Sequence, residues 1–271
     1  MRPEGIPAPL PVLRSALLRD FPHGFTTRDG GASRPPFDSL NLGGRVGDDP
    51  GRVADNWRRL EEATGLRFAR VRQVHGARAV RLDAACEPAE EADAIVTASP
   101  GVAATVAVAD CVPVLLADPE SGAVAAVHAG WRGTLAHAAA EGVRALSRAS
   151  GAPPARLLAA VGPSIGPCCY EISPDLAATF ARVLGVDVIR SGARPRLDLW
   201  MASRRVLQEA GIAPDRIEIL GRCTSCEPAA FFSHRRDAGR TGRQVGFVAP
   251  GGAAATTRPG GRRFGGRAQE V

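Results

Sequence analysis

Lysine is absent from this sequence, and all 34 of its basic residues are arginines. Together with the many Ala, Gly and Pro residues, this indicates a GC-rich coding bias rather than selection for a surface that tracks phosphates. The formal net charge is +6, and about half of the excess lies in residues 250–271, which carry four arginines and one glutamate. The rest of the chain is only weakly basic. The composition therefore argues against a nucleic-acid partner.

Long apolar runs are also lacking. No stretch approaches the roughly 18 apolar residues that a membrane span requires, so we expect no membrane partner. The N-terminal residues contain no apolar core of the kind found in a signal peptide. The six cysteines are irregularly spaced, with Cys168 and Cys169 adjacent, which is unlike the disulfide framework of a secreted protein. The default expectation is a cytoplasmic protein.

The apolar pattern predicts an α+β fold with mixed β-sheets, a central hairpin and flanking helices, because strands and helices follow one another without a regular βαβ rhythm. Asp49-Pro50 and Gly65 are the start and stop signals of one helix. We expect helices over residues 52–64, 134–147, 174–184 and 199–210. Residues 28–41 are expected to form an ordered loop, which residues 39–44 continue. With its buriable Phe37, Leu40 and Leu42, this segment is expected to line a functional site.

We expect one catalytic domain over residues 21–249. An N-terminal extension, residues 1–20, would precede it. A Gly- and Arg-rich tail, residues 250–271, would follow it, and its composition predicts disorder.

The stretch TVAVADCVPVLLADPESGAVAAVHAGWRGT, residues 105–134, is the centre of the prediction. Its apolar runs at residues 112–117 and 123–129 flank a turn-forming segment, which predicts a hairpin. If residues 118–121 form the loop, Ala117 pairs with Gly122 and Cys111 lies directly opposite His128. Their Cβ atoms would be roughly 5 Å apart, a suitable gap for a metal ion or a thiolate–imidazole pair. A one-residue bulge at Gly122 would instead leave the two residues as diagonal neighbours. Either residue alone would more simply be part of the core, but the pair in this register favours a site.

His75 is the candidate third ligand, because two histidines and one cysteine with an open position are a known catalytic zinc set. Cys223 and Cys226 form half of a zinc ribbon without a second half, and the simplest interpretation is packed thiols near a cleft. No phosphate-binding glycine motif is present. Any phosphate would therefore be held by arginines such as Arg28, Arg132 or Arg235.

Several motifs resemble, in order, those of the YfiH-type family, also called the polyphenol oxidase or laccase domain, whose members are now mostly described as purine nucleoside phosphorylases. The likeness runs from about residue 24 to residue 248. The motifs are GFTTR at 24–28 with SLNLG at 39–43, QVHG at 73–76, ADC at 109–111, HAGWRG at 128–133, GPCCYE at 166–171, and FSHRRD at 232–237 with TGRQ at 241–244.

The resemblance implies a YfiH/CNF1-like sandwich with a catalytic zinc held by His75, Cys111 and His128. It further implies phosphorolysis of adenosine, inosine, guanosine and methylthioadenosine, with adenosine deamination as a second activity. The partners would be purine nucleosides and phosphate, and the chain would be a monomer or a weak homodimer. By their placement in the motifs, the candidate substrate contacts are Arg28, Asn41, Arg132, Tyr170 and Glu171.

Three other interpretations remain at this point. A copper polyphenol oxidase is disfavoured because five histidines are too few for a mononuclear and a trinuclear copper site. A Cys–His amidase that edits peptidoglycan precursors would use Cys111 as nucleophile and His128 as base. A non-enzymatic module would use zinc only for stability, so that removing the metal would unfold it.

Overall fold

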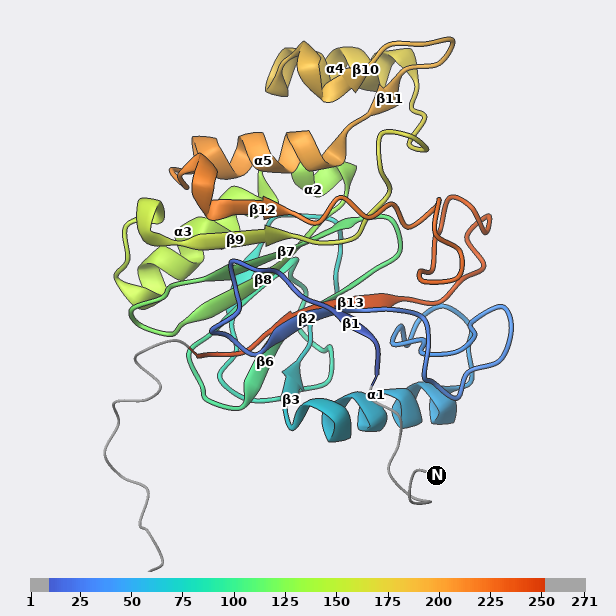
Figure 1. Ribbon diagram of the computed structural model, residues 1–271, viewed down its shortest axis with the longest axis vertical. Helices are drawn as coiled ribbons and strands as arrows, with labels where there is room; N and C mark the ends of the chain where they lie inside the picture. Colours follow the sequence, from blue (N-terminus) through green and yellow to red (C-terminus); the bar gives the residue numbers. More distant parts are fainter. Residues whose placement is uncertain (1–9, 252–271) are drawn as a thin grey trace, which may run out of the picture.

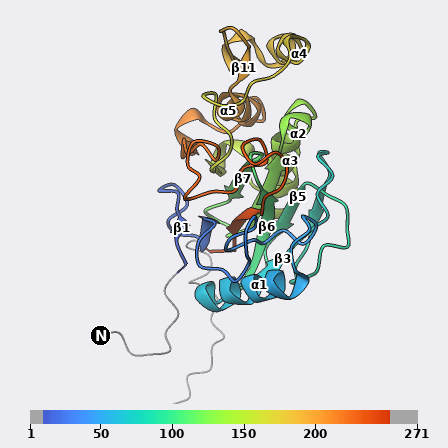
Figure 2. The same cartoon turned by 90° about the vertical axis from the view of Figure 1, so that its right-hand side faces the viewer.

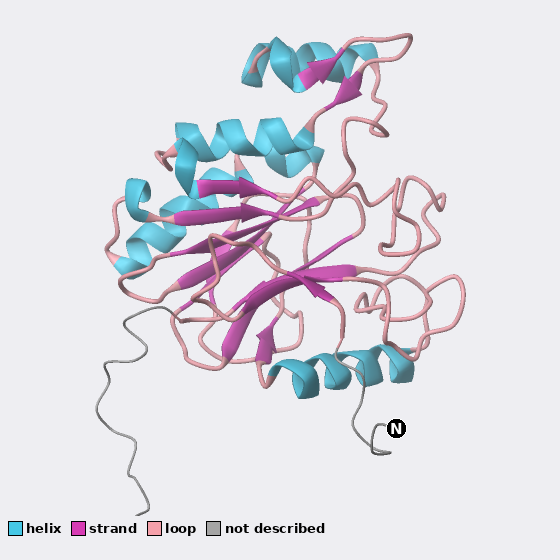
Figure 3. Ribbon diagram, viewed as in Figure 1, coloured by secondary structure: helices cyan, strands magenta, loops and turns pink. Residues whose placement is uncertain are grey.

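The computed structural model describes residues 10–251 and consists of two stacked β-sheets between helices (Figures 1 and 3). Residues 1–9 and 252–271 lie outside the described part. Most of the predicted tail and about half of the predicted N-terminal extension are therefore not covered. The layers, from α1 upward in Figure 1, are a helix, a five-stranded sheet, a six-stranded sheet and a group of helices.

The five-stranded sheet has the order β1-β2-β13-β6-β3 and is mixed, because β3 pairs in parallel with β6 while the other pairs are antiparallel. Its strands include the first two and the last one of the described chain, so this sheet brings the two ends of that chain together. They are β1 (Val12–Leu13), β2 (His23–Thr26), β3 (Arg67–Ala69), β6 (Val102–Val108) and β13 (Gln244–Val248).

The six-stranded sheet has the order β12-β9-β7-β8-β5-β4, with parallel pairs at its two edges and antiparallel pairs at its centre. The inner faces of the two sheets share one buried cluster, in which Phe25 and Val106 meet Leu115 and Ala126. The strands are β4 (Ala79–Arg81), β5 (Ala94–Thr97), β7 (Val112–Ala117), β8 (Val124–Ala129), β9 (Leu158–Val161) and β12 (Ile217–Ile219).

Helices cover both outer faces, as the view turned by 90° also shows (Figure 2). On the five-stranded sheet lies α1 (Pro50–Thr64), which packs Trp57 against Phe68 at 5.5 Å between ring centroids. Its predicted signals are confirmed, since Asp49 caps the first turn and Gly65 ends the helix with a left-handed φ of 69°. On the six-stranded sheet lie α2 (Trp131–Leu135), α3 (Ala138–Ser150) and α5 (Leu199–Glu209).

A smaller layer lies beyond α5 and consists of α4 (Pro174–Leu184) and the two-stranded sheet β10 (Ile189–Arg190) and β11 (Arg196–Leu197) (Figure 1). Short 3-10 helices occur at Pro154–Arg156, Val186–Val188 and Pro214–Arg216. Among residues 10–251, no helix is both long and apolar enough to cross a lipid bilayer. The predicted α+β class with mixed sheets, central hairpin and flanking helices is confirmed.

The predicted hairpin forms between β7 and β8, but its predicted register is wrong by two residues. Ala117 pairs with Val124 rather than Gly122, and His128 lies opposite Pro113. The turn is longer because the Asp118 carboxylate accepts backbone N–H groups from Glu120 and Ser121 and stabilises a wider loop. A shift of two residues keeps every side chain on its predicted face, so Cys111 and His128 remain diagonal neighbours.

The predicted helix over residues 134–147 is wrong in its continuity. It is divided into α2 and α3 at His137, which has a left-handed φ of 57°. This conformation stops one helix and begins the next. His137 is thus a junction residue and not part of a continuous helix.

The loop of residues 28–41 is ordered by the buried Asn56 side chain, which donates to the carbonyls of Ser39 and Asn41 and accepts from the Ala32 N–H. Of the segment predicted to line a site, residues 42–44 line the large cavity described below, together with Arg45 and Val46. Residues 28–41 do not line it. Asn56 lies on α1 and holds the loop in place through these hydrogen bonds.

Candidate metal centre

Two connections and one strand place the candidate ligands in one cavity of about 1310 Å³. His75 lies in the turn between β3 and β4, Cys111 lies in the turn between β6 and β7, and His128 lies on β8. Strands β6 and β7 belong to different sheets, so Cys111 is located where the chain crosses from one sheet to the other. The cavity therefore opens at the junction of the two layers.

The donor atoms of His75, Cys111 and His128 all lie within 4.8 Å of one another. Cys111 Sγ is 3.9 Å from His75 Nε2, and the two imidazole rings meet edge to face at 4.8 Å between centroids. Gly130 makes this approach possible, because a Cβ atom there would lie 2.8 Å from Cys111 Sγ. The backbone is also strained at this point, since His75 and Asp110 have φ angles of 61° and 87°.

Asp93 orients the His128 imidazole of the cluster, and the sequence analysis did not identify it. Its buried carboxylate lies 2.8 Å from His128 Nδ1 and accepts the backbone N–H groups of His75 and Gly76. A proton held on Nδ1 leaves His128 Nε2 free to face Cys111 and His75. The only sequence signal was an acidic residue directly before the apolar run that forms β5.

The electrostatics of the cluster favour a thiolate. Burial alone would raise the pKa of the Cys111 thiol. The charge of His128 and the hydrogen bonds from His128 and His75 outweigh this effect and lower the pKa to about 6. Burial lowers the pKa of His128, but the Cys111 thiolate and the Asp93 carboxylate raise it to about 9. Without metal the pair is a thiolate and an imidazolium at neutral pH. Binding of a metal ion at His128 Nε2 would then release the proton on that nitrogen, while the proton on Nδ1 stays.

This arrangement predicts the pH dependence of thiol alkylation in the metal-free protein. Because the pKa is lowered, Cys111 should be a thiolate already at neutral pH, and its rate of reaction with iodoacetamide should be half-maximal near pH 6. Peptide mass spectrometry across a pH series measures that rate for Cys111 alone. In the His128→Asn variant the midpoint should move up toward the ordinary thiol value of 9.0. A wild-type midpoint already near that value would contradict the thiolate–imidazolium pair.

The donor set fits a tetrahedral metal ion with one open position, because it supplies two imidazole nitrogens and one thiolate, with a carboxylate behind one imidazole. It does not fit a multicopper centre. All five histidines lie in the described part of the chain, and only His75 and His128 converge. His23 is buried elsewhere, with its ring nitrogens bonded to the backbone of Ser15 and Phe21.

Replacing Asp93 by asparagine should weaken metal binding about 10- to 100-fold, the range typical of lost outer-shell partners of ligating histidines. The amide can still accept one N–H but no longer carries the charge that holds the His128 proton on Nδ1. Competition with a fluorescent chelator measures the affinity. Asp198→Asn is the matched control, since it changes another buried carboxylate, one that pairs with Arg190 and caps α5 and does not belong to the cluster. An unchanged affinity in Asp93→Asn would contradict the assigned role.

Two of the predicted substrate contacts, Arg132 and Tyr170, line the same cavity as the candidate metal ligands. The Arg132 guanidinium stacks on Trp131 at 4.2 Å from the ring centroid. Arg235, also on the lining, lies 5.0 Å from the Tyr170 centroid and donates to the Glu171 carbonyl. Burial and the nearby Cys111 raise the pKa of Tyr170 to about 12, so its phenol stays protonated at neutral pH.

The other three predicted contacts do not line this cavity. Arg28 forms an ion pair with Asp38 and stacks on Phe232. Asn41 is fully buried and bonds Asp48 and the backbone of Gly43 and Arg243. The Glu171 side chain is exposed and pairs with Arg194. Sequence reasoning did not find Gln73, His234 or Arg243 as lining residues.

The fold and this site together define a known class of protein. Residues 22–250 match the family model described as multi-copper polyphenol oxidoreductase laccase, and the chain belongs to this family. A relative from Deinococcus radiodurans, named purine nucleoside phosphorylase, is 46% identical over 243 residues, covering 88% of this chain and 92% of the relative. Purine nucleoside phosphorylase SCO2081 from Streptomyces coelicolor is 43% identical, covering 83% and 93%.

Solved structures show the same fold. YlmD from Geobacillus stearothermophilus superposes with a TM-score of 0.83 at 36% identity, over 88% of this chain and 96% of that one. A protein named YfiH from Bacillus licheniformis gives a TM-score of 0.84 at 33% identity, over 92% and 100%. The resemblance drawn from the ordered motifs is therefore confirmed.

Proposed function

We propose that this chain is a zinc-dependent purine nucleoside phosphorylase. It would convert adenosine, inosine, guanosine or methylthioadenosine and phosphate to the free base and the sugar 1-phosphate, with adenosine deamination as a second activity. The observation that carries the proposal is the convergence of His75, Cys111 and His128 in a cavity that also presents arginines and aromatic side chains. The names of the relatives support the phosphorylase activity alone.

His75, Cys111 and His128 would hold the zinc ion. When bound, zinc would polarise an oxygen atom and lower the pKa of a water molecule, which suits attack on C6 of adenine. Asp93 keeps His128 in the required tautomer and orientation. Two imidazoles with a thiolate favour zinc over the copper that the family's description mentions, because no further imidazole in the described residues completes a copper cluster.

Arg132 and Arg235 are the proposed phosphate-binding residues. Each guanidinium is held against an aromatic ring, so its donors are fixed in direction before phosphate arrives. A phosphate oxygen would form the bond to C1′ of the ribose as the bond from C1′ to the base nitrogen breaks. The departing electron pair stays on the base, which takes up a proton. The protonated Tyr170 phenol is placed to donate a hydrogen bond in this cavity.

The amidase interpretation remains the second candidate, because the order Cys111, His128, Asp93 is that of a nucleophile, a base and an orienting carboxylate. It predicts activity in metal-free protein, whereas the phosphorylase requires metal. A zinc module without enzymatic activity predicts unfolding on metal removal.

We further propose that residues 21–249 act as one catalytic domain.

The test is product analysis with adenosine, with and without phosphate, on protein loaded with zinc. Phosphate-dependent adenine and ribose 1-phosphate, together with phosphate-independent inosine, are the expected products. Both should disappear after metal removal and return with zinc, while circular dichroism shows the fold retained. No turnover of adenosine, inosine or guanosine by metal-replete protein would overturn the proposal.

A further inference from the structure

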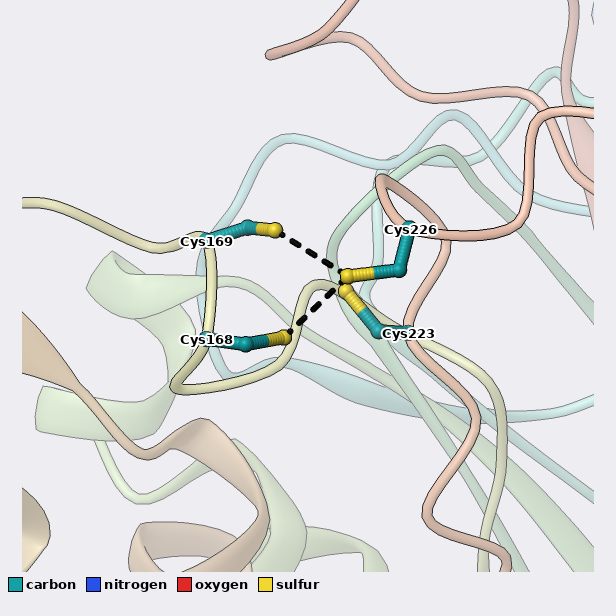
Figure 4. Close-up of side chains that lie close together, drawn as sticks. All are labelled: Cys168, Cys169, Cys223 and Cys226. Carbon is teal, nitrogen blue, oxygen red and sulfur yellow. Dashed lines mark hydrogen bonds between the residues drawn. The ribbon is translucent and has the colours of Figure 1, made fainter.

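A second cluster of metal-ligating side chains lies outside the cavity just described. It consists of Cys168, Cys169, Cys223 and Cys226, whose Sγ atoms all lie within 4.8 Å of one another (Figure 4). Cys226 Sγ is 3.4 Å from Cys168 Sγ and 3.3 Å from Cys169 Sγ. Among residues 10–251, this set and the His75 set are the two groups of three or more His, Cys, Asp or Glu side chains that could hold a metal ion.

The topology explains why residues so distant in sequence meet here. Strands β9 and β12 pair in parallel, so the loops that follow them leave the same edge of the six-stranded sheet. The first loop carries Cys168 and Cys169, and the second carries Cys223 and Cys226. A parallel bridge between Ser164 and Cys223 extends the pairing into the loops, with the Thr224 N–H donating to the Ser164 carbonyl at 3.0 Å.

The loops also supply donors to sulfur. Cys223 Sγ accepts the backbone N–H of Gly166 at 3.3 Å, across the two loops. Backbone N–H groups that point at a cysteine sulfur stabilise its thiolate form, which is the form that binds metals. The Arg196 guanidinium donates to the Cys168 carbonyl at 3.0 Å and brings a positive charge beside the cluster.

The arrangement is unlike packed core thiols. Cys168 and Cys226 are exposed and Cys169 is half-buried, whereas cysteines that serve as small apolar residues are usually buried. It is also unlike one disulfide with two spare thiols, since Cys226 is almost equally close to two partners on the other loop. Four sulfurs at 2.3 Å from a tetrahedral zinc ion would be about 3.8 Å apart, which lies within the range of separations found here.

We propose that Cys168, Cys169, Cys223 and Cys226 bind one zinc ion as four thiolates, in a closed structural site that joins the loops after β9 and β12. The thiol protons that binding displaces pass to solvent. With four protein ligands no position is left for water or substrate, so this site stabilises structure and does no chemistry itself. It differs from the simplest sequence-based interpretation of Cys223 and Cys226, which was packed thiols near a cleft.

The joined loops form one wall of the candidate active site. Thr224, between the two cysteines of its turn, donates its hydroxyl to Asp110 Oδ1 at 2.6 Å. From the other loop, the Ile165 N–H donates to the Asp110 carbonyl at 3.0 Å, and Tyr170 lines the cavity. Asp110 directly precedes Cys111. A zinc ion in the cysteine cluster would thus fix the position of a residue adjacent to a ligand of the first site.

Metal content tests this inference without reference to any activity, so it stands or falls separately from the proposed function. Protein is produced with zinc, kept under a non-chelating reductant and analysed by inductively coupled plasma and native mass spectrometry. Wild type should hold two zinc ions per chain, Cys226→Ser one, Cys111→Ala one, and the combined variant none. Cys86→Ser is the matched control, since Cys86 belongs to neither cluster, and it should hold two.

A second readout uses wild-type protein alone, in case Cys226→Ser fails to fold. Native-state alkylation with peptide mass spectrometry should leave the four cluster cysteines unmodified, including the exposed Cys168 and Cys226, until a strong chelator is added. A single zinc that Cys226→Ser retains and Cys111→Ala loses would overturn the proposal. Iron in place of zinc, a disulfide to Cys226 that persists under reductant, or alkylation of the exposed pair without chelator would also overturn it.

Discussion

Replacing Cys111 by alanine is expected to abolish both phosphorolysis and deamination, with a loss on the order of 10³-fold or more. The thiolate is the only negatively charged ligand among the three, and the remaining His75 and His128 would bind zinc weakly. The fold should persist, because Cys111 lies in a connection outside β6 and β7 and its removal leaves no large buried void. Initial rates with adenosine and inosine, together with zinc content, measure the effect.

Cys86→Ala is the control for Cys111→Ala, because Cys86 also lines the cavity but belongs to neither metal-ligating cluster, and its thiol bonds the Arg70 carbonyl. It should retain wild-type rates and metal content. Loss of rate in Cys111→Ala with full retention of metal would contradict the ligand role of Cys111. Substantial nucleoside turnover by Cys111→Ala would contradict its role in the proposed phosphorylase.

Replacing Arg235 by glutamine is expected to raise the KM for phosphate about 10- to 100-fold, because a charge-assisted hydrogen bond contributes about 1.5–3 kcal/mol. The guanidinium is held at the cavity by the Tyr170 ring and by the Glu171 carbonyl, so its loss removes a preoriented donor. Since deamination needs no phosphate, the ratio of adenine to inosine formed from adenosine should fall in step. Chromatography of the products over a phosphate series measures both quantities.

Arg148→Gln is the matched control for Arg235→Gln, since Arg148 is an exposed arginine on α3 that does not line the cavity. Its phosphate KM should equal that of wild type. Arg28→Gln provides a further contrast, because the ion pair with Asp38 and the stacking on Phe232 predict an effect on stability rather than on phosphate binding. A raised phosphate KM in Arg28→Gln, with no change in Arg235→Gln, would contradict the assignment.

Local signals predicted the elements of this fold well, and the differences arose where a side chain or an unusual backbone conformation changed a turn. Helix α1 begins after Asp49 and ends at Gly65 as expected, because helix caps depend only on neighbouring residues. The register of β7 against β8 depended on the Asp118 carboxylate, which bonds the turn N–H groups and widens the loop. The break between α2 and α3 has no Gly or Pro signal, since His137 adopts the left-handed conformation there.

The candidate metal ligands could be predicted because His75, Cys111 and His128 combine suitable residue types with recognisable motifs. The residues that support them could not. Asp93 is an ordinary acidic residue in sequence, and its role arises only when β5 pairs with β8 and brings it beside His128. Arg28 and Asn41 belong to the family motifs, yet their side chains contact loops and do not line the cavity. Membership of a motif does not distinguish structural side chains from substrate-facing ones.

The most direct test of the central proposal is the reaction of inosine with phosphate, because inosine carries no amino group that deamination could remove. Phosphorus NMR follows inorganic phosphate and ribose 1-phosphate in the presence of zinc-loaded, metal-free and zinc-reconstituted protein. The proposal predicts ribose 1-phosphate and hypoxanthine in equal amounts from the loaded and reconstituted protein, and none from the metal-free protein. Equal rates with and without zinc, or no ribose 1-phosphate from any of the three, would contradict a zinc phosphorylase built on His75, Cys111 and His128.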